Sequence, residues 1–240
     1  ESDGLTAYRQ SPLLTALPST TAEVAQVLRY CRAQGIKVVP RGAGSSLSAG
    51  AVPIHGGIVL ALTRLTRVVE VAPDELLAIA EAGVTTANLG AAVAGHGLCY
   101  PPDPGSFRVS TIAGNVATCA GGLRGLKYGV TRNYVLGLQV VLPTGEVIRT
   151  GGRLWKDVAG YDLTRLLTGS EGTLGVITEV TVALLPTPAT ARTGVAYFPT
   201  LAQAGVDRER ERAAGIVPTT MWSSRWPRVH AVEDRAGLGL

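Results

Sequence analysis

The chain has 240 residues, which is long enough to bury a sizeable core. Of these residues, 46% are hydrophobic and 17% are charged, a composition that excludes an intrinsically disordered chain. The net charge of +4 comes from 22 basic and 18 acidic residues without a basic run, so the composition argues against a nucleic-acid-binding protein. No apolar stretch reaches the length of a transmembrane helix, and Glu1-Ser2-Asp3 does not resemble the start of a signal peptide.

The cysteines and histidines are few and scattered. They are Cys31, Cys99, Cys119, His55, His96 and His230. An odd, sparse set of cysteines without a C-x-x-C pair predicts a reducing, cytoplasmic compartment rather than a disulfide framework. No histidine stands at metal-ligand spacing from another ligand, so we expect no metal site in this chain.

The first part of the chain predicts a small α/β unit. Thr20-Thr21-Ala22-Glu23 matches a capping box, and apolar residues then repeat at helical spacing as far as Cys31. Gly35 supplies the residue at which this helix ends. Strands are expected at 37–39, 58–62 and 67–71. The unit is expected to end near Asp74.

The following part predicts mainly strands. They are expected at 77–82, 134–142, 147–148 and 174–184. A helix is expected over 86–97, and the prolines of 101–106 require a loop. The turn at 143–146 predicts a hairpin. Pro186 and Pro188 mark a domain boundary.

A loop of small residues follows the first predicted strand, with the sequence Pro40-Arg41-Gly42-Ala43-Gly44-Ser45-Ser46. Gly42 and Gly44 permit backbone conformations that bring N–H groups close to a ligand, and such a nest suits a pyrophosphate. The loop has neither the third glycine of the dinucleotide fingerprint nor the spacing of a P-loop. Taken alone, it is compatible with a tight turn that binds nothing.

Three further segments are rich in glycine and small residues. They are Ser110-Thr111-Ile112-Ala113-Gly114-Asn115-Val116-Ala117-Thr118, the run from Gly121 to Gly129, and the run from Gly160 to Thr178, which includes Gly169-Ser170-Glu171-Gly172-Thr173-Leu174-Gly175. Together with the first loop, these segments resemble the flavin-binding domain of the p-cresol methylhydroxylase/vanillyl-alcohol oxidase superfamily. Within it, the chain is most similar to the FAD-binding subunit of glycolate oxidases and to D-lactate and D-2-hydroxyacid dehydrogenases.

The resemblance extends from Glu1 to about Pro188 and implies an α+β fold. It implies a two-subdomain FAD-binding domain over 1–188, divided into about 1–74 and 75–188, and the start of a truncated substrate cap over 189–240. It also implies a chain about twice as long, with the catalytic base, the substrate pocket and metal-binding histidines in the part that is absent here. We therefore expect no catalytic residue within these 240 residues.

The resemblance assigns cofactor contacts to particular residues. The loop Arg41, Gly42, Ala43, Gly44, Ser45 and Ser46 is expected to wrap the FAD pyrophosphate through its N–H groups. Pro102, Asp103 and Ser106 are expected to line a second side of the cofactor. Thr111, Gly114, Asn115 and Ala117 are expected along the ribityl chain and flavin ring, and Gly172, Gly175 and Ile177 at the adenine end.

Some members of the superfamily attach the flavin covalently through a histidine in the first loop. No histidine lies between Pro40 and Gly50, so non-covalent FAD is expected. Lys127 is a candidate for neutralising charge near the flavin or a substrate carboxylate, with a plain surface lysine as the alternative.

Three functions remain open from the sequence. The first is the FAD-binding part of an enzyme that oxidises a D-2-hydroxy acid, glycolate or D-lactate, by hydride transfer to FAD. The second is a non-catalytic flavin-binding or assembly subunit that a partner chain completes. The third is a fragment that binds nothing. The resemblance further implies other glycolate oxidase subunits as partners and a cytoplasmic place, with attachment to the inner face of the membrane as a variant.

Residues 222–229 depart from the family pattern, although Ala213–Pro218 and Ala231–Gly239 resemble it. We hypothesise two compensating frameshifts in the gene, one after Met221 and one before His230. They would replace the family sequence between these residues by an unrelated segment of equal length. A genuine loop anchored by Trp222 and Trp226 is the alternative. Because Pro227 interrupts a helix, the segment is expected to be irregular and exposed.

Overall fold

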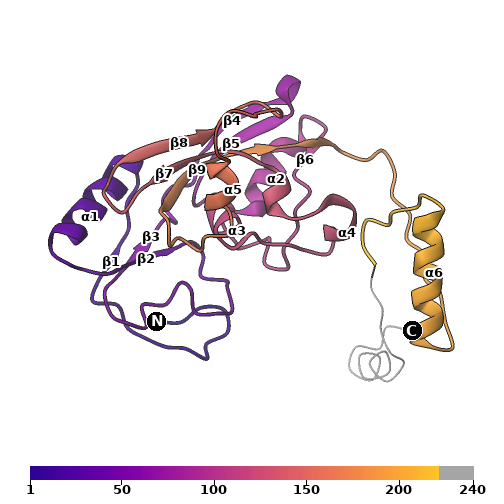
Figure 1. Ribbon diagram of the computed structural model, residues 1–240, viewed down its shortest axis with the longest axis horizontal. Helices are drawn as coiled ribbons and strands as arrows, with labels where there is room; N and C mark the ends of the chain where they lie inside the picture. Colours follow the sequence, from indigo (N-terminus) through magenta and orange to yellow (C-terminus); the bar gives the residue numbers. More distant parts are fainter. Residues whose placement is uncertain (222–240) are drawn as a thin grey trace.

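The computed structural model describes residues 1–221, and the segment 222–229, with the expectations attached to it, lies outside the described residues. The fold is α+β, as predicted (Figure 1). A three-stranded sheet has the order β1-β3-β2, a five-stranded sheet the order β4-β5-β9-β7-β8, and β10 pairs with β6.

The strands are β1 (Thr15–Ala16), β2 (Val38–Arg41), β3 (Ile58–Ala61), β4 (Val68–Ala72), β5 (Leu77–Glu81), β6 (Leu98–Cys99), β7 (Val135–Val141), β8 (Val147–Gly151), β9 (Val176–Ala183) and β10 (Leu185–Pro186). The helices are α1 (Thr21–Ala33), α2 (Thr86–Ala94), α3 (Ile112–Thr118), α4 (Gly125–Tyr128), α5 (Leu163–Leu167) and α6 (Leu201–Ala213). Two short 3-10 turns cover Pro73–Glu75 and Thr131–Asn133.

The first helix, α1, begins at the predicted cap. The hydroxyl oxygen of Thr20 accepts a hydrogen bond from the N–H of Glu23 at 3.2 Å, which satisfies one of the free donors of the first turn. The carboxylate of Glu23 accepts from the N–H and hydroxyl of Ser19, one residue earlier than in a regular capping box. These bonds lower the pKa of Glu23. Gly35, in the left-handed region at a φ of 63°, ends the helix as predicted.

The three-stranded sheet is parallel, and the glycine-rich loop leaves it at the end of β2. The strand β2 runs two residues further than predicted and includes Pro40. A proline fits there because β2 is an edge strand, so one side of it needs no ladder donor. The register of Arg41 against Ala61 fixes the point at which the loop starts.

The five-stranded sheet is antiparallel throughout and contains the predicted hairpin of β7 and β8. Its strand β4 pairs with β5, so the change from one sheet to the other falls between Ala61 and Val68. The subdomain boundary predicted from the sequence, near residue 74, lies at least six residues after this change of sheet. The division into a cofactor domain and a cap stays a proposal.

The largest part of the core lies between the five-stranded sheet and its helices. The helix α3 packs on β9 and β5, and α5 packs on β7 and β8. Leu89, Ile112, Val116, Val140 and Val180 are fully buried there. This packing presents one side of α3 to the glycine-rich loop after β2 (Figure 1).

The last described helix, α6, follows an extended segment and lies apart from the two sheets in Figure 1. Its Leu201 and Val206 are more than half exposed. No described helix has the length and apolar character needed to span a membrane.

Candidate cofactor-binding cleft

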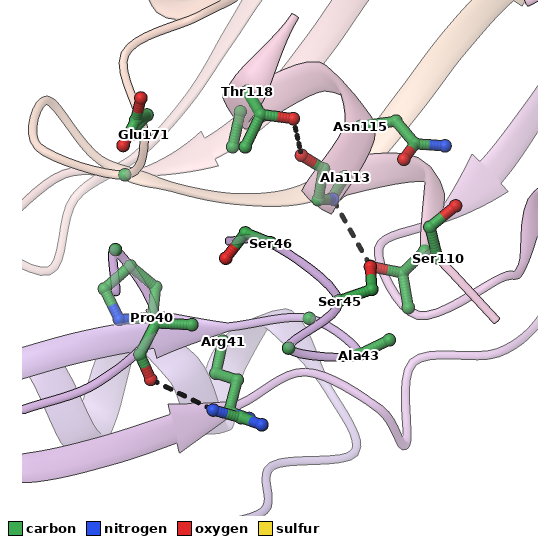
Figure 2. A pocket seen from close by; sticks show the side chains of 18 of the residues that line it. Pro40, Arg41, Ala43, Ser45, Ser46, Ser110, Ala113, Asn115, Thr118 and Glu171 are labelled. Carbon is green, nitrogen blue, oxygen red and sulfur yellow. Dashed lines mark hydrogen bonds between the residues drawn. The ribbon is translucent and has the colours of Figure 1, made fainter. Parts of the chain in front are cut away.

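A cleft of about 340 Å³ lies between the loop after β2, the helix α3 and the loop before β9. Its volume falls in the range of small-molecule sites. The lining is mostly small: Pro40, Arg41, Gly42, Ala43, Gly44, Ser45, Ser46, Leu47, Ser48, Gly50, Ala51, Leu62, Ala82, Ser106, Ser110, Thr111, Ala113, Gly114, Asn115, Ala117, Thr118, Ala120, Glu171, Gly172, Gly175, Val176 and Ile177. In Figure 2, Ser45 and Ser46 lie between Arg41 and α3, while Glu171 comes from the loop before β9.

The loop after β2 offers a run of free backbone donors to this cleft. Within the described residues 1–221, the N–H groups of 42–48 have no hydrogen-bond acceptor. A Cβ atom on Gly42 would collide with the hydroxyl of Thr111, so only glycine allows the loop to approach α3 this closely. Gly44 has a φ of 70°, and a Cβ atom there would collide with the guanidinium of Arg41.

The Arg41 side chain braces the loop that it begins. Its Nη1 donates to the carbonyl oxygen of Ala51 at 3.2 Å, which ties the two ends of the loop together. Figure 2 shows the guanidinium turned away from α3. Arg41 thus supplies a positive charge beside the unpaired N–H groups of the loop.

The N-terminal segment holds the same loop from outside. The side chain of Asp3 is buried, and its Oδ2 accepts from the N–H of Ala49 at 2.6 Å. Its Oδ1 accepts from the N–H of Leu5 at 3.0 Å, and the N–H of Gly4 donates to the carbonyl oxygen of Ser46 at 2.9 Å. These bonds fix the loop that carries the free donors.

Replacing Asp3 with Ala is expected to lower the free energy of unfolding by about 2 kcal/mol, because two backbone donors lose a charged acceptor. For a chain of this size, this corresponds to a Tm lower by about 5 °C. Affinity for a ligand of the loop should fall as well. Thermal denaturation beside Asp74→Ala, which removes the same charge at an exposed site, measures the effect. Equal melting temperatures for the two variants would contradict the bracing role.

The start of α3 is satisfied by the protein itself. The hydroxyl of Thr111 accepts from the N–H of Gly114, and the N–H groups of Ile112 and Ala113 donate to the carbonyl oxygens of Val84 and Ala82. The amide nitrogen of Asn115 donates to the hydroxyl of Thr86 at 2.6 Å. Asn115 therefore lines the cleft while it fixes α3 against α2.

The loop before β9 is fixed to the other end of α3. The N–H groups of Gly169 and Glu171 donate to the carbonyl oxygens of Val116 and Ala117, at 2.9 and 2.8 Å. Glu171 adopts a φ of 53°, in the left-handed region that few side chains occupy. The two glycine-rich loops, distant in sequence, thus meet across one cleft.

The ionisable groups of the lining are Arg41 and Glu171. Behind α3, burial raises the pKa values of Cys99, Tyr100 and Tyr134, so these groups are uncharged at neutral pH. The cleft therefore combines one cation, one carboxylate and many neutral donors.

The structure brings together most of the residues that the sequence assigned to the cofactor. Those in the cleft are Arg41, Gly42, Ala43, Gly44, Ser45, Ser46, Ser106, Thr111, Gly114, Asn115, Ala117, Gly172, Gly175 and Ile177. Pro102, Asp103 and Lys127 do not line it. Asp103 accepts from the N–H of Arg124 at 3.0 Å and pairs with its guanidinium, and the exposed Lys127 stacks over the ring of Tyr128.

Sequence reasoning missed Asp3 and Glu171 as elements of the site. Asp3 carries no local signal of this role, because its partner Ala49 lies 46 positions away in the sequence. Glu171 stands between Gly169 and Gly172 in a segment that was noticed for its glycines. A charged residue in such a glycine-rich run is the signal that could have identified it.

The residues present fit FAD. A pyrophosphate carries negative charge and many acceptor oxygens, which match the free N–H groups of 42–48 and the nearby Arg41. The absence of a Cβ atom at Gly42 and Gly44 lets a ligand approach the backbone. The hydroxyls of Ser45, Ser46 and Thr118 add neutral partners for ribose and ribityl hydroxyl groups.

Comparison with known proteins identifies the family. Residues 12–151 match the FAD binding domain family. The glycolate oxidase subunit GlcD of Bacillus subtilis is 44% identical over 238 residues, which cover 99% of this chain and 51% of that protein. The D-lactate dehydrogenase of Archaeoglobus fulgidus is 46% identical over 187 residues, which cover 78% of this chain and 42% of that protein.

A solved structure of alkyldihydroxyacetonephosphate synthase superposes with a TM-score of 0.72 at 28% identity, over 86% of this chain and 38% of that one. The chain spans about half the length of the glycolate oxidase subunits that it matches. The superfamily resemblance predicted from the glycine-rich segments is confirmed. The chain belongs to the family of FAD binding domains.

Proposed function

We propose that the cleft holds FAD non-covalently and that the chain is the FAD-binding part of an oxidoreductase acting on a D-2-hydroxy acid, glycolate or D-lactate. The observation that carries the proposal is the run of unpaired N–H groups at 42–48, which opens into a cleft lined by small residues. The names of the glycolate oxidase subunit and the D-lactate dehydrogenase among its relatives support the substrate class.

The proposal divides the cleft along the cofactor. The pyrophosphate lies at Arg41–Ser46, and the adenine end lies at Gly172, Gly175 and Ile177, where Gly172 is next to Pro40 at the start of the first loop. The ribityl chain and flavin ring follow α3 along Thr111, Gly114, Asn115 and Ala117, beside Ser106. Asp103 acts on the cleft only indirectly, since its contacts fix the 101–106 loop to Arg124.

The chemistry of the lining supports non-covalent binding. A covalent link to the flavin needs a nucleophilic or ring side chain such as histidine, cysteine or tyrosine. The residues that the structure places in the cleft include none of these three types. Protein precipitated with acid should therefore release its flavin into the supernatant.

The bound FAD supplies the acceptor for a hydride from the substrate carbon. This chain positions that acceptor and neutralises the pyrophosphate. We further propose that residues 189–240 begin a substrate cap, that other glycolate oxidase subunits are partners, and that the protein works in the cytoplasm. The three free cysteines of this chain support the last point.

A chimera tests the catalytic part of the proposal. Residues 1–188 replace the matching segment of the Bacillus subtilis glycolate oxidase subunit, and flavin content and reduction by glycolate are measured without oxygen. Loading with FAD followed by bleaching of the flavin absorbance on adding glycolate is expected. A chimera that binds FAD but is not reduced would contradict the oxidoreductase role and favour a non-catalytic flavin-binding subunit.

A further inference from the structure

We infer that a second cavity, beside the start of the loop after β2, binds a small aliphatic monocarboxylate through the guanidinium of Arg41. The cavity has a volume of about 290 Å³, at the lower end of the range of small-molecule sites. It shares residues 41–43 and Ala51 with the cleft proposed for FAD, and its other lining residues are its own. They are Glu1, Pro12, Thr15, Val52, Pro53, Val59, Ala61 and Thr63.

The cavity lies on the outer face of the three-stranded sheet. Side chains alternate between the two faces of a strand, so Leu60 and Leu62 share one face of β3, and Val59 and Ala61 share the other. Leu60 and Leu62 belong to the main core, whereas Val59 and Ala61 line the cavity. Arg41 pairs with Ala61 in the register of β2 and β3, which places its side chain on the cavity face as well.

The guanidinium of Arg41 has unused hydrogen-bonding capacity. Its Nη1 donates to the carbonyl oxygen of Ala51, and among residues 1–221 the guanidinium has no other acceptor and no carboxylate partner. The side chain is half-buried, and Figure 2 shows it turned away from α3. A partly buried cation without a counter-charge is costly, so an anion in the cavity would be stabilised there.

The rest of the lining selects the kind of anion. Val52, Pro53 and Val59 are buried and apolar, which suits the aliphatic body of a ligand. A carboxylate matches the planar guanidinium of Arg41 with two parallel hydrogen bonds. The carboxylate of Glu1, an exposed lining residue, repels a second negative charge on the ligand. The cavity therefore fits a short aliphatic monocarboxylate better than a phosphate dianion.

The acid bound here is a regulator of the cofactor cleft and not its substrate. It binds the guanidinium on the side away from α3, whereas we place the flavin ring along α3. The acid neutralises the charge that Arg41 supplies beside the pyrophosphate, so the acid and FAD weaken each other's binding. This coupling, unlike the site itself, rests on the proposed function.

The first test measures binding to the ligand-free chain. Saturation-transfer NMR titrations give the dissociation constants of isobutyrate and of isobutyramide, which has the same shape without the charge. Isobutyrate should bind with a Kd of about 1 mM and about tenfold more tightly than the amide, since the amide loses the charge-assisted bonds to Arg41. Inorganic phosphate at the same concentration should not displace isobutyrate.

Two variants locate the bound acid. Arg41→Gln removes the charge and Ala61→Leu fills the cavity from the sheet, and each should weaken isobutyrate binding by about tenfold. Ala72→Leu is the matched control, since Ala72 is a half-buried strand residue outside the lining, and it should bind isobutyrate as the unaltered chain does. Thermal denaturation establishes that each variant is folded.

Three outcomes would overturn the inferred site. They are equal affinity for isobutyrate and isobutyramide, displacement of isobutyrate by phosphate at equal concentration, and a folded Ala61→Leu variant with unaltered affinity.

Flavin fluorescence tests the coupling, and the Kd of FAD should rise by about fivefold in saturating isobutyrate. An unchanged Kd would overturn the coupling. Failure to bind FAD at all would overturn the proposed function and the coupling with it, while the isobutyrate titrations still decide the site.

Discussion

Replacing Gly44 with Val is expected to abolish the retention of FAD. Gly44 has a φ of 70°, which a β-branched residue adopts only at a cost of about 1–3 kcal/mol. A side chain there would also displace the guanidinium of Arg41, and with it the bond to Ala51 that closes the loop. The N–H groups of the loop would then no longer converge on a pyrophosphate. The flavin absorbance per purified chain measures the effect.

The control for this prediction is Gly35→Val. Gly35 has a similar φ of 63° at the end of α1, and the space around its added Cβ atom is open. This variant should lose stability from the same backbone strain but keep its flavin. If Gly44→Val purified yellow with full flavin occupancy, the assignment of the pyrophosphate loop would be wrong.

The isolated 240-residue chain is expected to bind FAD without oxidising glycolate or D-lactate. Oxidation of the hydroxyl carbon needs a positioned base and an anchor for the substrate carboxylate, in addition to the flavin. In the described cleft, Arg41 is the one cation and donates to Ala51, and the one carboxylate, Glu171, stands next to Gly172 in the loop proposed for the adenine end. No group of the lining is then left for these two tasks.

Dye reduction measures this prediction, with free FAD at the same concentration as the blank. The expected rate equals the blank within error, although the protein carries bound flavin. Steady reduction clearly above the blank would show that this chain contains a base and a carboxylate anchor, with Lys127 as the first residue to replace.

The regular elements with a clear period were predictable from the sequence. The helix from Thr21 and the strands β3, β5 and β7 are within a few residues of the expected ranges, since each buries a continuous apolar face. The helix α3 was not predicted, because its seven residues include glycine, asparagine and threonine and show no apolar period. Its first turn is instead stabilised by the carbonyl groups of Ala82 and Val84, which are distant in sequence.

The candidate site was predictable only where a local sequence pattern marks its residues. Glycines that allow close approach, such as Gly42 and Gly44, have a local signature, and the structure places both in the cleft. Asp103 was assigned to the cofactor by the resemblance, but it lies outside the lining and pairs with Arg124. The role of Asp3 depends on a bond to Ala49 and has no local signature at all.

Titration of the ligand-free chain with FAD tests the central claim most directly. Flavin fluorescence should be quenched with a stoichiometry of about one FAD per chain, and acid precipitation should return all of the flavin to the supernatant. Gly44→Val should show no quenching under the same conditions, while Gly35→Val should match the unaltered chain. An unaltered, folded chain that fails to quench FAD fluorescence, or a Gly44→Val variant that quenches it fully, would contradict the assignment of this cleft to FAD.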